Sequence, residues 1–208
     1  MQGYVLRCGS LEFESKPQIP SPDDEESPSM WLCLDEVVDP QNFGALLRSA
    51  YFLGASDKKG IGIMVCSKNS APPTPVVSAA SAGALELCKV YSTTNLPRTL
   101  TAAKENGWRV LGAAASAPNG MIDEITGEEV ICQDLNDVDV HDTKPTILVL
   151  GSEGHGLRTL VSRACSGFVR IPGSDISIFE GQTQAGVDSL NVSVTGGIML
   201  WHFLSGNK

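Results

Sequence analysis

The stretch LVLGSEGHGLRTL, residues 148–160, follows an apolar run with six positions that hold three glycines, a serine, a glutamate and a histidine. Glycine is favoured where the backbone needs a positive φ or must approach another group closely. The stretch lacks the Lys-Ser/Thr ending of a phosphate-binding loop and does not fit the dinucleotide pattern G-x-G-x-x-G. Backbone amides left free at the start of the next helix could hold an adenosine, and a sharp strand-to-helix turn without a ligand is the alternative.

A second stretch, LDEVVDPQNFGALLRSAYFLGA at 34–55, places two polar residues in a helical pattern with one apolar face. Asp39 and Pro40 are typical of a helix start, and Asn42 and Arg48 follow along the helix. Because Arg48 lies six residues after Asn42, nearly two turns on, the two residues share only part of one helix face. For an isolated arginine, a solvated side chain or a surface salt bridge is the alternative to a catalytic role.

The third stretch, GVDSLNVSVTGGIMLWHFL at 186–204, begins an apolar helix with a Ser-Leu-Asn turn. Ser189 and Asn191 could contact a ligand at this turn. Either could equally be an ordinary N-cap, since serine and asparagine are among the favoured capping residues. Met199 and Trp201 lie further along the helix, where we expect them to pack in the core.

These stretches sit at junctions in a repeating pattern of strands and helices. Apolar strand-like runs occupy 30–37, 60–66, 87–92, 108–114, 146–151 and 168–172. Helical patterns occupy 40–54, 75–84, 95–106, 156–165 and 190–205. Strands this apolar, separated by helices, predict an α/β fold with a parallel sheet covered on both faces. In such a sheet ligands bind beyond the carboxyl ends of the strands, which is where the glycine-rich corner lies.

The chain of 208 residues is long enough for one domain with short attachments, and its net charge is −9. Residues 1–30 and 119–142 hold the excess acid, and without them the chain has slightly more basic than acidic residues. Charge therefore does not exclude a nucleic acid partner. We expect 16–30 to be a linker or disordered loop and the acidic stretch 117–144 to be an exposed loop.

Several functional classes find no support in the composition. No apolar run approaches the roughly 18 residues that a membrane span needs, so we expect none. The N-terminus resembles neither a secretory signal nor a transit peptide. Six cysteines are spaced far apart without a C-x-x-C pair, which favours buried, reduced thiols over a metal site or disulfides.

In their order along the chain, the motifs D-P-x-N-x-G-x-x-x-R-S-A, L-G-S-E-G-x-G-L and S-L-N-V-S-V closely resemble those of one enzyme family. This is the SpoU (TrmH-like) branch of the SPOUT methyltransferases, and the resemblance covers 31–205. Its members transfer a methyl group from S-adenosylmethionine to a ribose 2′-hydroxyl of RNA. Within the branch the chain looks most like fungal mitochondrial large-subunit rRNA methyltransferases. That likeness implies a mitochondrial location and a guanosine of this rRNA as the target.

The resemblance implies a deep trefoil knot near the C-terminus, within a SPOUT methyltransferase domain at 31–208 that forms a homodimer. S-adenosylmethionine would lie against Gly151, the segment ending at Ile171 and the turn at Leu190. No metal would be needed. The segment 172–188, which separates the last two positions, is longer than in compact relatives and could be disordered or close over the substrate.

For the chemistry, the resemblance gives the leading role to Arg48. Because the pKa of arginine lies above ~12, we expect it to stabilise the developing alkoxide, alone or with an RNA phosphate, rather than to act as a free base. Asn42 would position Arg48 or the RNA, and Glu153 would orient its own loop or Arg48. Ser189 and Asn191 would fix the cofactor and the target ribose.

Two other interpretations fit part of the sequence. A non-catalytic ribosome-assembly factor could keep the same fold, although all the motif side chains are present. A nucleotide-dependent oxidoreductase would need a glycine-rich turn after the first strand, where this chain reads EVVDPQNFG. Members of the SpoU branch often carry an N-terminal RNA-capture domain. Residues 1–30 would be a linker or a remnant of that domain, and without the rest of it we expect weak RNA binding.

Overall fold

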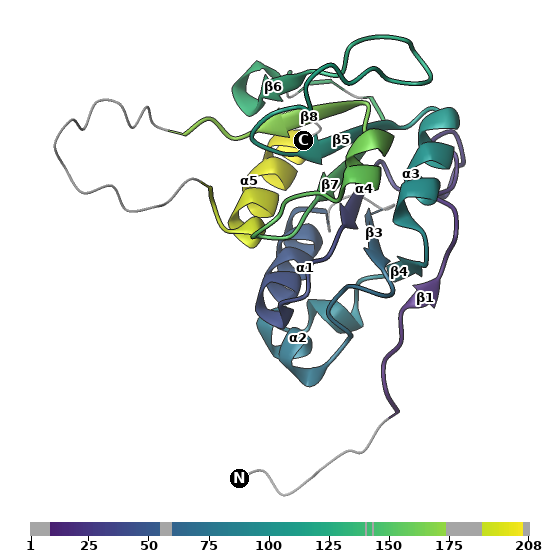
Figure 1. The fold of residues 1–208 in the computed structure, drawn as a ribbon. Helices are drawn as coiled ribbons and strands as arrows, with labels where there is room; N and C mark the ends of the chain where they lie inside the picture. Colours follow the sequence, from purple (N-terminus) through teal and green to yellow (C-terminus); the bar gives the residue numbers. More distant parts are fainter. Residues whose placement is uncertain (1–8, 55–59, 140, 143, 174–188, 206–208) are drawn as a thin grey trace, which may run out of the picture.

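The computed structural model describes residues 9–54, 60–139, 141–142, 144–173 and 189–205. Within them, parallel strands form one sheet that helices cover on both faces (Figure 1). The strands are β1 (Glu14–Ser15), β2 (Met30–Leu34), β3 (Ile61–Cys66), β4 (Val90–Thr93), β5 (Arg109–Ala113), β6 (Cys132–Asp134), β7 (Thr146–Leu150) and β8 (Gly167–Arg170). The helices are α1 (Pro40–Gly54), α2 (Pro75–Ala80), α3 (Leu96–Glu105), α4 (Thr159–Ala164) and α5 (Val192–Ser205), with 3-10 turns η1 (Ala84–Glu86) and η2 (Leu135–Asp137).

The strands pair in the order β1-β4-β3-β2-β7-β5-β8-β6, and every pair is parallel. This confirms the predicted parallel α/β sheet, and the predicted strands and helices form near their predicted positions, except that the helix predicted at 75–84 ends at Ala80. β2 lies between β3 and β7, although β7 comes much later in the chain. The loops that leave the carboxyl ends of β2 and β7 are therefore neighbours.

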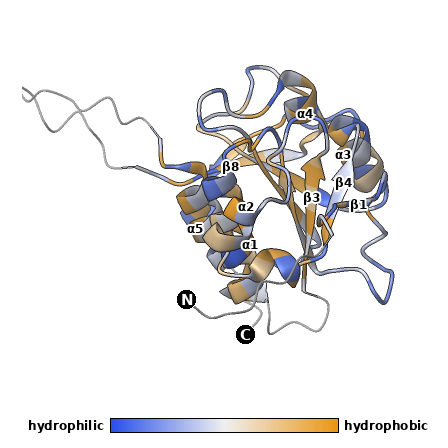
Figure 2. Cartoon of the chain, turned by 90° about the horizontal axis from the view of Figure 1, so that it is seen from below, coloured by the Kyte–Doolittle hydropathy of each residue, from blue (hydrophilic) through white to orange (hydrophobic). Residues whose placement is uncertain are grey.

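The two faces of the sheet carry separate hydrophobic layers, as expected for buried parallel strands. Along β2, Met30, Leu32 and Leu34 pack in the layer under α1, α2 and α5, whereas Trp31 and Cys33 pack in the layer under α3 and α4. Figures 1 and 2 show the two helix groups on opposite sides of the sheet. Each fully buried side chain of this kind contributes about 1.5–3 kcal/mol.

The predicted helix 75–84 is interrupted, because α2 ends at Ala80 and η1 begins only at Ala84. Ala82 has a φ of 53° and Gly83 a φ of 87°. Residues in the left-handed region end an α-helix, so the chain turns here instead of continuing.

The acidic stretch 117–144 differs from the exposed loop that we expected. It contains β6, which pairs with β8, and Val130, Leu135 and Val138 within it are buried. Basic residues outside the stretch neutralise part of its charge, in the ion pairs Lys104–Asp123, Arg109–Asp142 and Arg170–Asp134. The expectation was wrong because like charges were counted without the partners that the fold brings to them.

Residues 16–29 contain no helix or strand, but they are held against the domain. Just before them, β1 pairs with β4 and extends the sheet. Ile19 is buried, and the indole Nε1 of Trp108 donates a 2.8 Å hydrogen bond to the carbonyl of Pro20. The sequence did not indicate these contacts, since a strand of two residues is too short to show a period of two.

Within the described part of the chain, no helix is both long enough and apolar enough to cross a bilayer. The five cysteines in this part are free, and Cys33, Cys66 and Cys165 are buried as expected. Burial raises the pKa of the Cys165 thiol to about 12, which keeps the thiol protonated at neutral pH. Cys88 and Cys132 are half-buried.

Candidate active site

A cavity of about 290 Å³ opens at the carboxyl ends of β5, β7 and β8, against the first turns of α5. In open α/β folds this is the edge of the sheet where ligands bind. Gly151, Ile171 and Leu190, which we expect to hold the cofactor, line the cavity, and so do Glu153 and Ser189. The fold therefore brings these five residues together around one space.

Most of the long segment at 172–188 cannot be related to this cavity, because residues 174–188 lie outside the described residues. Pro172 and Gly173, which are described, continue outward from β8 and are exposed.

The loop between β7 and α4 begins at Gly151. The backbone that approaches Gly151 closely belongs to the same loop, at Gly156 and Leu157. A Cβ atom on Gly151 would lie 2.5 Å from the Leu157 nitrogen and closer still to the Gly156 carbonyl group. Ser152 and Gly156 exchange two backbone hydrogen bonds of 3.0 Å, and Gly156 has a φ of 65°. The glycines therefore permit a tight loop that presents main chain to the cavity at Gly151.

Side chains from three distant stretches meet beside the cavity. Asn42 on α1 donates through Nδ2 to Glu153 Oε2 at 3.2 Å. The Oδ1 atom of Asn42 accepts from Asn191 Nδ2 at 3.0 Å, and Asn191 also donates to Glu153 Oε1. Asn42 is buried, whereas Glu153 and Asn191 are exposed. This asparagine–glutamate cluster therefore reaches from the core to the surface, where a large substrate can approach it.

Asn191 also caps α5. Its Oδ1 accepts hydrogen bonds from the Ser193 nitrogen at 2.9 Å and the Ser193 hydroxyl at 2.6 Å, with the Val194 nitrogen at 3.4 Å. The side-chain oxygen thus accepts hydrogen bonds from the first turn of α5, while the side-chain nitrogen donates to Asn42 and Glu153. The N-cap role is therefore confirmed for Asn191, and its contact with a ligand stays a prediction.

Arg48 stands apart from the cluster. It lies on the exposed side of α1 and does not line the cavity. It makes no hydrogen bond or ion pair with any other residue that the structure describes. Within one chain, the fold therefore does not bring this guanidinium to the other predicted site residues.

Trp201 does not lie in the core, where we expected it, because its side chain is 60% exposed on α5. Met199 is buried as expected and lines the cavity. Leu190, Val194, Ile198 and Trp201 recur at helical spacing and form an exposed apolar face. The expectation was wrong because a helix that is apolar on all sides does not reveal from its sequence which side is buried.

One ion pair beside the site was not predicted from the sequence. Asp35, directly after β2, is fully buried, and its carboxylate accepts hydrogen bonds from the backbone nitrogen of Arg158 at 2.9 Å and from Arg158 Nε at 2.7 Å. An acid at the end of an apolar run was an available signal, since a carboxylate is rarely buried without a partner. The identity of the partner depended on the strand order.

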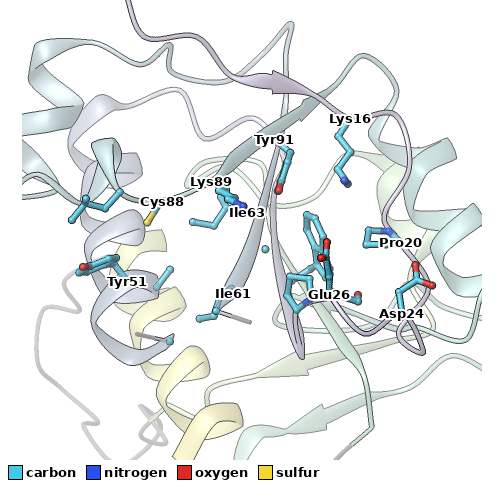
Figure 3. A pocket seen from close by; sticks show the side chains of 18 of the residues that line it. Lys16, Pro20, Asp24, Glu26, Tyr51, Ile61, Ile63, Cys88, Lys89 and Tyr91 are labelled. Atoms are coloured by element: carbon cyan, nitrogen blue, oxygen red, sulfur yellow. The ribbon is translucent and has the colours of Figure 1, made fainter. Parts of the chain in front are cut away.

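A larger cavity of about 660 Å³ lies at the amino ends of β2, β3 and β4 (Figure 3). Lys16 and Tyr91 line it, with the Lys16 ammonium 4.8 Å from the centre of the Tyr91 ring, and Asp24 and Glu26 also face this space. It contains none of the predicted site residues and lies at the opposite ends of the strands from the asparagine–glutamate cluster. We therefore place the candidate active site at the smaller cavity.

Comparison with known proteins gives a consistent result. The model of the SpoU rRNA Methylase family matches residues 29–201. The mitochondrial rRNA methyltransferase 1 of Homo sapiens is 39% identical over 90% of this chain and 48% of its own length. The 23S rRNA (guanosine-2'-O-)-methyltransferase RlmB of Pseudomonas syringae is 36% identical over 88% of this chain and 60% of its own length. The chain thus spans about half the length of these relatives.

Solved structures show the same fold. An AdoMet-bound rRNA methyltransferase from Sinorhizobium meliloti superposes with a TM-score of 0.63, covering 91% of this chain and 60% of that chain at 22% sequence identity. At this identity the likeness concerns the arrangement of strands and helices. It places the parallel sheet of this chain within a known architecture.

Proposed function

The chain belongs to the SpoU rRNA methylase family, whose model covers residues 29–201, and from this premise we propose that it methylates a ribose 2′-hydroxyl in rRNA with S-adenosylmethionine as the donor. The observation that carries the proposal is the hydrogen-bonded cluster of Asn42, Glu153 and Asn191. Each of these residues comes from a different one of the three motifs. Their meeting beside a cavity is what a catalytic centre built from those motifs requires.

The smaller cavity fits S-adenosylmethionine in its chemistry. Gly151 presents main chain to it, while Ala113, Leu190 and Met199 supply apolar wall. Backbone groups near Gly151 and Ile171 would hold the adenine, and the volume is close to the ~300 Å³ at the lower end of small-molecule sites. When bound, the sulfonium supplies a methyl group that is already activated for transfer.

With an activated donor, the protein must chiefly align the ribose oxygen with the methyl group. Holding two reactants in line can supply ~7–11 kcal/mol of the barrier. We assign this alignment to Asn42, Glu153 and Asn191, whose mutual hydrogen bonds restrict one another, with Ser189 at the cavity edge. Arg48 stabilises the developing alkoxide as a fixed positive charge, because a guanidinium is a poor base, and an RNA phosphate beside it takes the 2′-proton.

Because Arg48 lies outside the cluster of its own chain, we assign it to the site of a second copy in a homodimer. α1 and α5 pack against each other, so the outer sides of both helices lie next to one another. Phe52 on α1 is 80% exposed, and Ile198 and Trp201 are exposed on α5. This apolar surface beside Arg48 is what we propose the second copy covers.

The finer features follow the family. The C-terminal segment forms a trefoil knot, and residues 31–208 form the methyltransferase domain. Residues 1–30 are a linker or a remnant of an N-terminal RNA-binding domain, and β1 and Ile19 within them pack against the methyltransferase domain. The position of α5, which begins at the cavity and then packs on α1, supports the knot. The target that we propose is a guanosine of the mitochondrial large-subunit rRNA, and the location is the mitochondrion. The name of the Pseudomonas syringae relative supports the guanosine, and that of the human relative supports the mitochondrion.

The test is to delete the gene and to map the 2′-O-methyl groups of the mitochondrial large-subunit rRNA. We expect one guanosine to lose its methyl group and to regain it with the wild-type gene, but not with Arg48→Ala. Arg163→Ala, which changes an exposed arginine of α4, is the matched control and should restore methylation. If every 2′-O-methyl group survives the deletion, the chain is not this enzyme, and a non-catalytic assembly factor becomes the better account.

A further inference from the structure

The ion pair of Asp35 and Arg158 connects the two loops that carry site residues. Asp35 lies between β2 and α1, and the same α1 carries Asn42 in its first turn. Arg158 lies between β7 and α4, at the end of the loop that carries Glu153. Three contacts join the pair, namely the two hydrogen bonds to Asp35 and the approach of Arg158 Nη2 to Asp35 Oδ1 at 2.6 Å.

Because Asp35 is buried, its carboxylate needs a charged and hydrogen-bonded partner, which Arg158 provides. Its carboxylate is 0% exposed, and a buried ionised carboxylate costs several kcal/mol unless it is paired and hydrogen-bonded. The hydrogen bond to Asp35 raises the pKa of the Arg158 guanidinium, against the opposing effect of burial. The backbone nitrogen of Asp35 also donates to the carbonyl of Leu150 at 2.8 Å. The two strand ends are thus tied through both main chain and side chains.

The neighbouring residue shows that the backbone here is held under strain. Glu36 has a φ of 61°, a conformation that costs a residue other than glycine about 1 kcal/mol or more. Its Oε1 accepts a 2.7 Å hydrogen bond from Asn69 and lies 3.6 Å from Arg158 Nε. A strained residue persists only where its surroundings fix it, and Arg158 is part of those surroundings.

The loop from Gly151 to Leu157 is fixed at two points and open between them. The Ser152–Gly156 backbone pair closes its base, and Arg158 anchors its far end. Glu153 and Gly154 lie between these points, and a Cβ atom on Gly154 would meet no atom of the described residues within 4 Å. The Asn42–Glu153 hydrogen bond therefore depends on how the two loops are set relative to each other.

We infer that Asp35 and Arg158 are positioning residues, which tie the loop of Glu153 to the start of α1 and so set the Asn42–Glu153 contact that aligns the ribose. This inference rests on the proposed function. Neither residue lines the smaller cavity, so they act on the reaction through Asn42 and Glu153 rather than by touching the donor.

The test uses three variants of the full protein, with Arg163→Ala on the adjoining helix α4 as the matched control. Arg158→Ala removes the side-chain tie, and Arg158→Lys keeps the charge but offers a single ammonium in place of a planar fork. Arg158→Ala alone leaves the buried carboxylate of Asp35 without its ion-pair partner. The double variant Asp35→Asn with Arg158→Ala removes that charge as well. It therefore keeps the test usable if Arg158→Ala alone does not fold.

We expect kcat for rRNA methylation to fall on the order of tenfold to a hundredfold in Arg158→Ala and in the double variant, since small misplacements of reacting groups have effects of this size. Arg158→Lys should recover part of the loss. The Kd for S-adenosylmethionine should change less than about threefold, because main-chain groups at Gly151 hold the donor. A kcat within twofold of wild type in both variants, or a loss confined to donor affinity, overturns the inference.

A readout without catalysis separates this inference from the proposed function. Hydrogen exchange at the Gly156 and Arg158 amides should accelerate by about tenfold or more in the double variant, while the Val149 amide within β7 keeps its protection. If the wild-type protein methylates no RNA, the proposed function fails, and the exchange rates still show whether the pair holds the loop. Unchanged exchange at both loop amides overturns the inference even in an active enzyme.

Discussion

At the scale of single residues, the site is built from groups that serve two contacts each. Asn191 caps α5 with its oxygen and donates to Asn42 with its nitrogen, so the helix and the cluster constrain the same side chain. The resemblance of the three motifs to the SpoU family was what singled out Asn42, Glu153 and Asn191, because the spacing within each motif left its ordinary structural alternative open. It could not assign the partner of Asp35, because the pairing of β2 with β7 decides which distant residue meets that carboxylate.

Gly151 offers a sharp test of the loop geometry. Gly151→Ala should lower the free energy of unfolding by about 1–3 kcal/mol, because the methyl group must displace the backbone at Gly156. It should also weaken S-adenosylmethionine binding on the order of tenfold, since the displaced backbone forms the cavity edge. Urea unfolding and titration calorimetry measure the two effects.

The control is Gly154→Ala in the same loop, where the added methyl group meets open space among the described residues. Its free energy of unfolding should stay within about 0.5 kcal/mol of wild type. An equal loss of unfolding free energy in Gly151→Ala and Gly154→Ala would contradict this account. It would mean that the flexibility of the loop matters and that the contact between residues 151 and 156 does not.

At the scale of elements, periodicity predicted the strands and helices because apolar residues repeat along most of them. It failed where a local backbone conformation or a distant partner decides the outcome. The left-handed residues at Ala82 and Gly83 divide one predicted helix, and basic residues from elsewhere let the acidic stretch 117–144 join the sheet. α5 was predicted as a helix, but its buried side was not, because it is apolar on nearly every side.

Packing between α1 and α5 depends on Gly196. A Cβ atom at this position would lie 2.7 Å from Leu150 Cδ1 and closer still to Leu46 Cδ2. Gly196→Ala should therefore destabilise the fold by about 1–3 kcal/mol in urea unfolding. Gly197→Ala is the adjacent control, because its methyl group would lie at an ordinary 3.6 Å from Ser49 Oγ. That variant should be neutral or more stable by up to about 1 kcal/mol, through helix propensity. A Gly197→Ala variant that loses as much stability as Gly196→Ala contradicts the packing argument.

The acidic stretch should make stability depend on pH through Asp123. This buried carboxylate is 3.2 Å from Lys104 Nζ and accepts hydrogen bonds from the Ile125 and Thr126 nitrogens. Although burial alone would raise its pKa, these hydrogen bonds and the Lys104 charge lower it on balance. A carboxyl group with a lowered pKa in the folded state stabilises the fold above its unfolded pKa of about 3.9, and that contribution is lost as pH falls through the folded value.

We expect Asp123→Asn to be less stable than wild type at pH 7, by about 2–4 kcal/mol, since it leaves the Lys104 ammonium buried and unpaired. The part of this difference that comes from the Asp123 charge should shrink as the pH falls below about 4. Urea unfolding at pH 7 and pH 3 measures it. Glu124→Gln, at the exposed neighbouring position, should behave as wild type at both values. If the stability difference between wild type and Asp123→Asn is larger at pH 3 than at pH 7, the pKa of Asp123 is not lowered in the folded state and this account is wrong.

At the scale of the whole molecule, the sequence predicted one globular unit, and the sheet with its two helix layers agrees. A single chain does not bring all of the predicted site residues together. Arg48 and the asparagine–glutamate cluster stay apart, and the side of α5 that carries Trp201 is left uncovered. Both facts have one explanation if two copies pack through α1 and α5, because symmetric dimers bury the same surface on each partner.

Mixing two inactive variants tests that explanation directly. Arg48→Ala lacks the arginine, and Glu153→Gln keeps the shape of the cluster while removing its charge. In a mixed dimer, one site combines the intact Glu153 of one subunit with the intact Arg48 of the other, and the second site has neither. Random pairing in equal amounts should therefore restore about a quarter of the wild-type methylation rate. Adding Trp201→Glu to both variants should abolish the restoration, because it places a charge in the proposed interface. If the mixture stays as inactive as its components while mixed dimers are present, Arg48 acts on the site of its own chain.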